Sequence, residues 1–133
     1  MKLKNKVAIV TGASGYLGGA IARRLGVLGY GVVVNYHRNL AGAEKTVQDI
    51  NRGPGQATVC KADVRHFPDV QNMVRLAVDK FGRLDVTVCN AGGSLGMLNH
   101  TLKEKLLLDH ESEEWDLVME TNIKGSFNLI KAS

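Results

Sequence analysis

Short apolar segments alternate with amphipathic segments along most of this chain. The apolar segments predict strands at residues 7–10, 32–34, 57–60 and 84–89. Their interiors are nearly continuous runs of β-branched and other apolar residues, which is typical of strands buried on both faces of a sheet. Because an amphipathic segment follows each of these strands, the order predicts an α/β fold with a doubly wound parallel sheet.

Four amphipathic segments have the apolar spacing of helices. The first follows a glycine-rich turn, and its predicted buried face carries Ala20, Ile21, Leu25 and Leu28. The second covers residues 41–50 and ends at a Gly-Pro-Gly sequence. The third, after Pro68, is the most regular and ends at Gly82; its apolar positions are Val70, Met73, Val74, Ala77, Val78 and Phe81. The last runs from about residue 112 towards residue 133. The intervening stretch 93–111 has the length of a lid or binding loop, with residues 103–108 a candidate short helix.

Composition restricts the function without identifying it. The 133 residues, 44% of them hydrophobic, suit one domain, residues 1–133, with a real core. No apolar run has membrane-spanning length and the first residues lack a signal-peptide core, so we expect a cytoplasmic protein without membrane contact. Cys60 and Cys89 have no metal-ligand spacing, so we expect reduced core thiols and no metal site. The net charge of +4 is scattered, which argues against nucleic acid and suits a phosphate-bearing cofactor.

The turn after the first predicted strand has three evenly spaced glycines. A strand, a glycine turn and a helix, in this order, form the pyrophosphate site of many α/β proteins. Gly12 suits the tight turn, Gly15 a close approach of backbone to pyrophosphate, and Gly18 tight packing of the helix. The helix start adds unpaired N–H groups and a positive dipole end. The loop's predicted cofactor-binding residues are Gly12, Ser14, Gly15, Tyr16, Leu17 and Gly18.

Three further segments occur in a fixed order after this loop. They are Ala62-Asp63-Val64, the strand 84–89 ending in Asn90-Ala91-Gly92, and Thr121-Asn122-Ile123-Lys124-Gly125-Ser126-Phe127. Together with the glycine loop, they resemble the short-chain dehydrogenase/reductase family over essentially the whole chain. The resemblance implies a Rossmann-like NAD(P)-binding domain. It also implies hydride transfer between NADPH and a small carbonyl or alcohol substrate, and a homo-oligomer.

The resemblance gives each segment a role. Asp63 would accept a hydrogen bond from the adenine amino group and Val64 would donate its backbone N–H to the ring; alternatively, Asp63 only caps a turn. Asn90, Ala91 and Gly92 would face the cofactor ribose, at the point beside the first strand where open α/β sheets bind ligands. Asn122 would join the catalytic residues.

The end of the second predicted strand favours NADP over NAD. A carboxylate there would hold the ribose 2′-hydroxyl and repel a 2′-phosphate. This chain instead has Asn35, His37 and Arg38 in that region. Arg38 offers several donors to a phosphate, with His37 adding to the positive field. The alternative is that Arg38 is only a solvated loop residue.

Two features depart from the family's pattern. Tyr16 stands where short members of the family usually have glycine, so the glycine spacing resembles that of the longer, nucleotide-sugar-modifying branch. The family's catalytic Ser and Tyr-x-x-x-Lys also have no counterpart, because the tyrosines are at 16, 30 and 36 and none has a lysine four positions later. The chain thus resembles the amino-terminal half of a reductase, without the last strands of the fold. Two hypotheses stay open: an NADP-dependent reductase represented by its cofactor half, and a non-catalytic dinucleotide-binding or interaction module.

Overall fold

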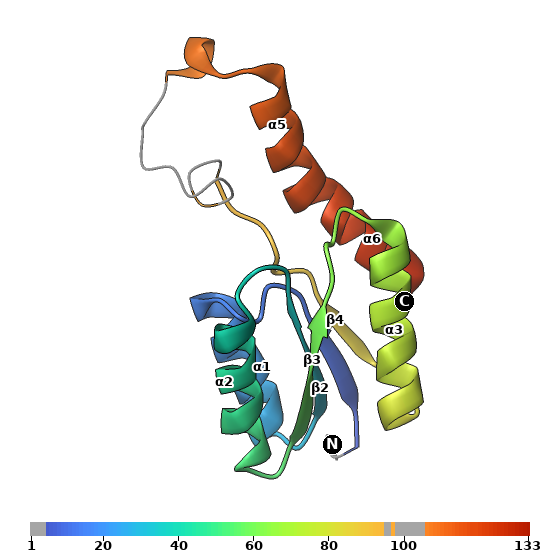
Figure 1. The fold of residues 1–133 in the computed structure, drawn as a ribbon. Helices are drawn as coiled ribbons and strands as arrows, with labels where there is room; N and C mark the ends of the chain where they lie inside the picture. The colour runs from blue at the N-terminus through green and yellow to red at the C-terminus, as the bar shows by residue number, and fades with distance from the viewer. Residues whose placement is uncertain (1–4, 95–96, 98–105) are drawn as a thin grey trace.

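A computed structural model describes residues 5–94, 97 and 106–133. The elements are β1 (Val7–Val10), α1 (Tyr16–Val27), β2 (Gly31–Tyr36), α2 (Leu40–Asn51), β3 (Gln56–Lys61), α3 (Phe67–Phe81), β4 (Val86–Val88), η1 (Leu107–Asp109), α5 (Ser112–Met119), η2 (Glu120–Lys124) and α6 (Gly125–Ala132). The described strands form one parallel sheet in the order β3-β2-β1-β4. Helices cover both faces (Figure 1), so the predicted doubly wound α/β fold is confirmed.

Successive side chains of the central strands point to opposite faces of the sheet, and an apolar core forms on each face. In β1, Ala8 and Val10 face the layer of α1 and α2, whereas Val7 and Ile9 face the layer of α3 and α6. This follows from the two-residue period of a strand. Leu129 of α6 is fully buried in the second core, so the last helix is anchored on α3.

The buried face of α1 agrees only in part with the predicted one: Ile21 and Leu25 pack against the first core as predicted, but they are only partly buried. Small residues line it, namely Gly18, Gly19, Ala22 and Gly26. Ala20 and Leu28, which were predicted to be buried, are exposed. The cause is the close packing of α1 on α2: a Cβ atom added to Gly26 would lie 2.6 Å from Ile50 Cγ2. At Gly26, α1 therefore has no room for a side chain, because Ile50 of α2 fills the space.

The other differences from prediction concern the ends and edges of elements. β2 and β3 are longer than predicted, and β4 is shorter and half-buried because it forms an edge of the sheet. Val78 of α3 and the Cys89 thiol are exposed rather than in the core. Residues 103–105 of the candidate helix 103–108 lie outside the described residues, and η1 begins within its second half.

The helices α5 and α6 are joined without a break, but the hydrogen-bonding pattern of the backbone changes between them. Between α5 and α6, the backbone of η2 forms a π-helical turn, in which the N–H of Gly125 bonds to the carbonyl of Glu120. α5 has no buried residue and projects past the carboxyl ends of the strands, as Figure 1 shows. None of the helices in the described residues is long and apolar enough to cross a membrane.

Candidate functional site

The glycine loop joins β1 to α1 at the carboxyl edge of the sheet. Gly12 has φ +66°, in the left-handed region that favours glycine, and a Cβ there would lie 3.0 Å from Ala91 Cα. A Cβ on Gly18 would lie 2.5 Å from both Asn90 Nδ2 and the Gly12 carbonyl oxygen. Gly15 is different, since its Cβ would meet only the Gly12 oxygen, at 3.4 Å. Packing thus requires glycine at 12 and 18, while Gly15 leaves room for a ligand.

The start of α1 is suited to an anion. Gly15 is its N-cap and supplies no side-chain hydrogen bond, and the first turn contains no acidic residue. The N–H groups of a first helical turn have no partner within the helix, and the dipole there is positive. This arrangement fits the pyrophosphate of a dinucleotide.

Thr11 connects the glycine loop to the segment after β4. Its hydroxyl donates to the Val88 carbonyl at 3.1 Å and accepts from the N–H groups of Asn90 and Ala91, each at 3.0 Å. Asn90 Nδ2 returns a hydrogen bond to the Thr11 carbonyl at 2.9 Å. Asn90 therefore supports the loop rather than facing the cavity described next. Thr11 was not among the predicted site residues.

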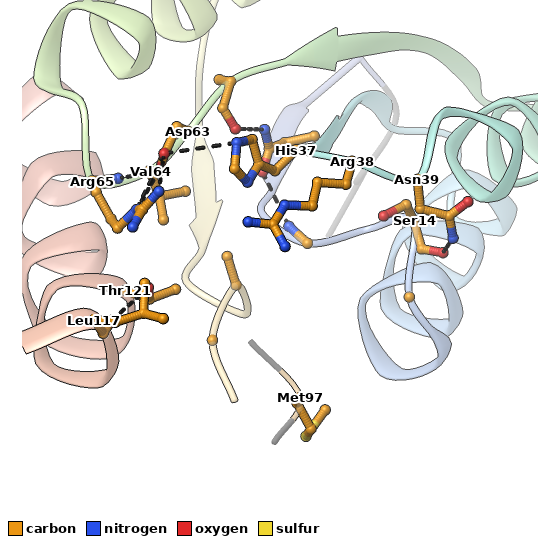
Figure 2. A pocket seen from close by; sticks show the side chains of 16 residues that line it. Ser14, His37, Arg38, Asn39, Asp63, Val64, Arg65, Met97, Leu117 and Thr121 are labelled. Carbon is orange, nitrogen blue, oxygen red and sulfur yellow. Dashed lines mark hydrogen bonds and ion pairs between the residues drawn. The ribbon is translucent and has the colours of Figure 1, made fainter. Parts of the chain in front are cut away.

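A cavity of about 340 Å³ opens beside this loop, a volume within the range of small-ligand sites. Figure 2 shows its walls, which come from the ends of β2 and β3, the segment after β4, and α5. Ten predicted site residues line it: Gly12, Ser14, Gly15, Asn35, His37, Arg38, Asp63, Val64, Ala91 and Gly92. Six further lining residues were not predicted: Asn39, Ala62, Arg65, Met97, Leu117 and Thr121.

Asn35 holds the cavity wall together from behind. Its Oδ1 accepts from the Gly12 N–H at 3.1 Å, and its Nδ2 donates to the Ala62 carbonyl at 3.1 Å. The side chain is only 2% exposed, so these contacts occupy it fully. Asn35 thus links the ends of β1, β2 and β3. Asn39 has a similar task at the start of α2, where Nδ2 donates to the Ser14 carbonyl at 3.2 Å; an Asn before an amphipathic run was the available signal.

Asp63 is the one acidic residue that lines the cavity, and Arg65 forms a bidentate ion pair with its carboxylate. Arg65 Nε and Nη2 donate to the two carboxylate oxygens at 3.0 and 2.6 Å, and the Arg65 backbone N–H adds a bond of 3.0 Å. His37 Nε2 lies 3.7 Å from the same carboxylate. The hydrogen bonds from Arg65 hold the pKa of Asp63 below its usual range. Asp63 therefore does bond to its own turn, as the alternative interpretation expects, while it also lines the cavity.

Asn122 does not line the cavity. It lies in the π-helical turn, where its side-chain amide pairs with both backbone groups of Gly93 and also donates to the Val118 carbonyl at 2.8 Å. A Cβ on Gly92 would collide with its Oδ1. π-helical turns often accompany functional sites.

The remaining predicted residues lie outside the cavity wall. Tyr16 is 94% exposed and Leu17 is exposed beside it, at the solvent side of α1. Gly18 is buried beneath the loop. Within the described part of the chain, no group of three or more His, Cys, Asp or Glu could hold a metal ion.

The chain matches the short chain dehydrogenase family over residues 6–133. It belongs to this family. It is 39% identical over 127 residues to the 3-oxoacyl-[acyl-carrier-protein] reductase FabG of Staphylococcus epidermidis, covering 96% of this chain and 49% of the relative. The corresponding protein of Staphylococcus aureus is 38% identical over 126 residues, with 95% and 48% covered.

Solved structures show the same relationship. A short chain dehydrogenase from Burkholderia cenocepacia in complex with NADP is 29% identical, with a TM-score of 0.87 over 99% of this chain and 51% of that one. A dehydrogenase/reductase from Sinorhizobium meliloti is 28% identical, also with a TM-score of 0.87, covering 98% and 50%. The chain spans about half the length of the curated relatives it matches, and it corresponds to the amino-terminal half of the family fold.

Proposed function

We propose that this chain binds NADP in the cavity at the carboxyl edge of the sheet, as the cofactor-binding half of an oxidoreductase. One observation carries the proposal. The glycine loop, the α1 start without a side-chain cap and the ends of β2 and β3 all border this edge, and the loop and both strand ends line one cavity. When bound, the reduced nicotinamide supplies a hydride; the residues of this chain bind and orient the adenosine and pyrophosphate.

The charges around the cavity support NADP rather than NAD. The segment after β2 contributes His37 and Arg38 and no carboxylate. The one acidic lining residue, Asp63, is paired with Arg65, so its charge is balanced. A 2′-phosphate would therefore meet no unbalanced negative charge. The NADP complex of the Burkholderia cenocepacia relative supports the same preference.

The resemblance to FabG suggests the reaction of the whole protein. We propose hydride transfer between NADPH and a carbonyl or alcohol, with a 3-oxoacyl thioester as the first substrate to test, because the relatives are 3-oxoacyl-[acyl-carrier-protein] reductases. Asn122 would contribute to this reaction by holding the segment after β4 in place, since its side-chain amide is hydrogen-bonded to Gly93 and Val118.

A direct test is a calorimetric titration of the chain with NADPH and with NADH. We expect saturable binding of both and at least about tenfold tighter binding of NADPH, the ratio that one charged hydrogen bond provides. The same preparation should not oxidise NADPH with a panel of carbonyl compounds, because the chain has no Tyr-x-x-x-Lys. Absence of binding would contradict the proposal.

The second candidate is a non-catalytic dinucleotide-binding or interaction module. The cavity is lined by residues of this chain alone, as such a module requires. The genomic sequence after codon 133 separates the two candidates: an in-frame Ser and Tyr-x-x-x-Lys supports the reductase, and a stop codon supports the module.

We also propose that the chain pairs with a second copy of itself and works in the cytoplasm. Ile123, Phe127 and Ile130 are exposed at helical spacing, and β4 is an edge strand among the strands that the structure describes. Both cysteines are free, which suits a reducing compartment. Light scattering over a concentration series should show dimers or larger species, and Ile130→Asp should lower the average mass. A strictly monomeric chain would contradict the pairing.

A further inference from the structure

The backbone N–H of Val64 differs from its neighbours in the segment between β3 and α3. The neighbouring N–H groups all bond within the protein, namely those of Ala62, Asp63, Arg65 and His66. Among the residues that the structure describes, none accepts from the N–H of Val64. Val64 is only 6% exposed, and it lines the cavity (Figure 2). Because the N–H groups of buried residues are almost always paired, this one indicates an acceptor on a ligand.

The rest of Val64 is fixed from α6. Its carbonyl accepts from Asn128 Nδ2 at 2.9 Å, and the same amide donates to the Arg65 carbonyl at 3.3 Å. Asn128 is buried, so water does not compete for these bonds. The Val64 side chain packs on Gly125, where an added Cβ would lie 2.6 Å from Val64 Cγ2. The helix therefore sets both the carbonyl and the side chain of Val64, and with them the orientation of its N–H.

An acceptor lies next to this donor in the sequence. The Asp63 carboxylate accepts from three N–H groups of Arg65, namely the backbone N–H, Nε and Nη2. An ionised carboxylate offers about four acceptor positions, so one position stays open. Adenine carries the complementary groups side by side, since its ring nitrogen N1 accepts and the adjacent amino group donates. The N–H of Val64 and the carboxylate of Asp63 therefore suit this edge of the base.

We propose that Asn128 is a positioning residue for recognition of the adenine, because it holds Val64 with its N–H directed at N1 of the base. Asn128 lies on α6 behind the segment and does not line the cavity, so it acts through Val64 and not on the cofactor. The family resemblance implies the bond from Val64 to the ring; the geometry adds the residue that directs it. The inference rests on the proposed binding of NADP in this cavity.

The decisive experiment compares two ligands by calorimetry, on the unmodified chain and on Asn128→Ala. One ligand is NADPH, and the other is an NADPH analogue in which a C–H group replaces N1 of the adenine. On the unmodified chain NADPH should bind about tenfold more tightly than the analogue, the ratio that one hydrogen bond provides. In Asn128→Ala this ratio should fall to about threefold or less, because Val64 loses the contact that holds it. Equal losses for the two ligands would show a merely structural role and overturn the inference.

A second variant, Gly125→Ala, reaches Val64 by another route. The added Cβ would lie 2.6 Å from Val64 Cγ2, so that side chain has to move. The ratio between NADPH and the analogue should therefore fall as it does in Asn128→Ala. If Asn128→Ala does not fold, Gly125→Ala supplies the comparison. An unchanged ratio in folded Gly125→Ala would show that α6 does not direct the N–H of Val64, and would overturn the inference.

Asn51 provides a matched control at the other end of β3. Its Oδ1 accepts from the backbone N–H of Ala57 at 2.7 Å, outside the cavity. Asn51→Ala also removes a hydrogen bond between an asparagine amide and the backbone, but it should leave the ratio at its native value. A ratio that falls equally in Asn51→Ala would trace the effect to general destabilisation and contradict the role of Asn128.

The unmodified chain also separates this inference from the proposed function. If it binds neither ligand, the proposed function fails and the inference with it. If it binds NADPH and the analogue equally well, NADP binding stands and the inference is overturned, because Val64 then makes no bond to N1. A tenfold ratio that Asn128→Ala and Gly125→Ala both reduce supports the inference.

Discussion

The side-chain amide of Asn122 pairs with the backbone of Gly93 on both sides, accepting from its N–H and donating to its carbonyl, each at 3.0 Å. These two residues are 29 positions apart, and the pair joins the segment after β4 to the π-helical turn between α5 and α6. The pair therefore fixes the direction in which the chain leaves the carboxyl edge of the sheet.

Removing this pair should destabilise the protein. Asn122→Ala leaves both backbone groups of Gly93 without their partner, so we expect a loss of about 1–3 kcal/mol in the free energy of unfolding. Chemical denaturation monitored by circular dichroism measures it. Asn72→Ala, on the exposed face of α3, is the control and should change stability by less than about 0.5 kcal/mol. Equal stability of the two variants would contradict the role of the pair.

The two kinds of glycine in the loop should respond differently to alanine. In Gly18→Ala the new Cβ would lie 2.5 Å from Asn90 Nδ2, so we expect a loss of about 1–3 kcal/mol in stability. In Gly15→Ala the only close contact is 3.4 Å, so the thermal midpoint should hardly change. NADPH binding should nevertheless weaken in Gly15→Ala, because the methyl group enters the space proposed for the pyrophosphate. A Gly15→Ala chain that binds NADPH normally would show that the ligand does not approach there.

The sequence allowed the arrangement of the sheet to be predicted because each buried strand is a compact apolar run and Gly82 clearly ends α3. The buried face of α1 could be predicted only in part, through Ile21 and Leu25. Gly18, Gly19 and Gly26 are buried for their small size, and small residues give a weak hydropathy signal. The π-helical turn could not be predicted either, because no residue type or motif in the sequence marks the one residue added to that turn.

Within the candidate site, motif order located the loops, and side-chain geometry remained unpredictable. Asp63 was identified by its place after β3. Its bidentate ion pair with Arg65 depends on the rotamer of the Arg65 side chain, which the sequence pattern does not determine. Asn35 was assigned to the cofactor by position, whereas its buried amide is occupied by Gly12 and Ala62. Contacts between distant segments decide such details.

Arg38 should determine the preference between the two cofactors. Arg38→Ala removes a cation from the cavity wall, so NADPH binding should weaken by about 1–3 kcal/mol while NADH binding stays nearly unchanged. Arg75→Ala on the exposed face of α3 changes the net charge equally and serves as control. Calorimetry of the native chain and the two variants with both cofactors measures the six affinities. Equal losses for NADPH and NADH would mean that Arg38 does not read the 2′-phosphate.

Asp63 should contribute to stability in a pH-dependent way. Its pKa is lowered in the folded state by Arg65, relative to about 3.9 in an unfolded chain. The charged carboxylate therefore stabilises the fold fully at neutral pH, and this contribution is lost as the pH falls below about 4. The stability difference between the native chain and Asp63→Asn, followed by urea denaturation, should narrow over that range. A difference that stays constant with pH would exclude the Asp63–Arg65 ion pair as its source.

NADP is proposed to bind at the carboxyl edge of the sheet, between the glycine loop and the ends of β2, β3 and β4. Nuclear magnetic resonance of the labelled chain, titrated with NADPH, tests it most directly. The claim predicts that the largest amide shifts fall in residues 12–18, 35–38, 63–65 and 90–92. A second cavity at the opposite edge is lined by Lys6, Gln56 and Lys80. Shifts confined to that edge, or no shifts at saturating NADPH, would contradict the claim.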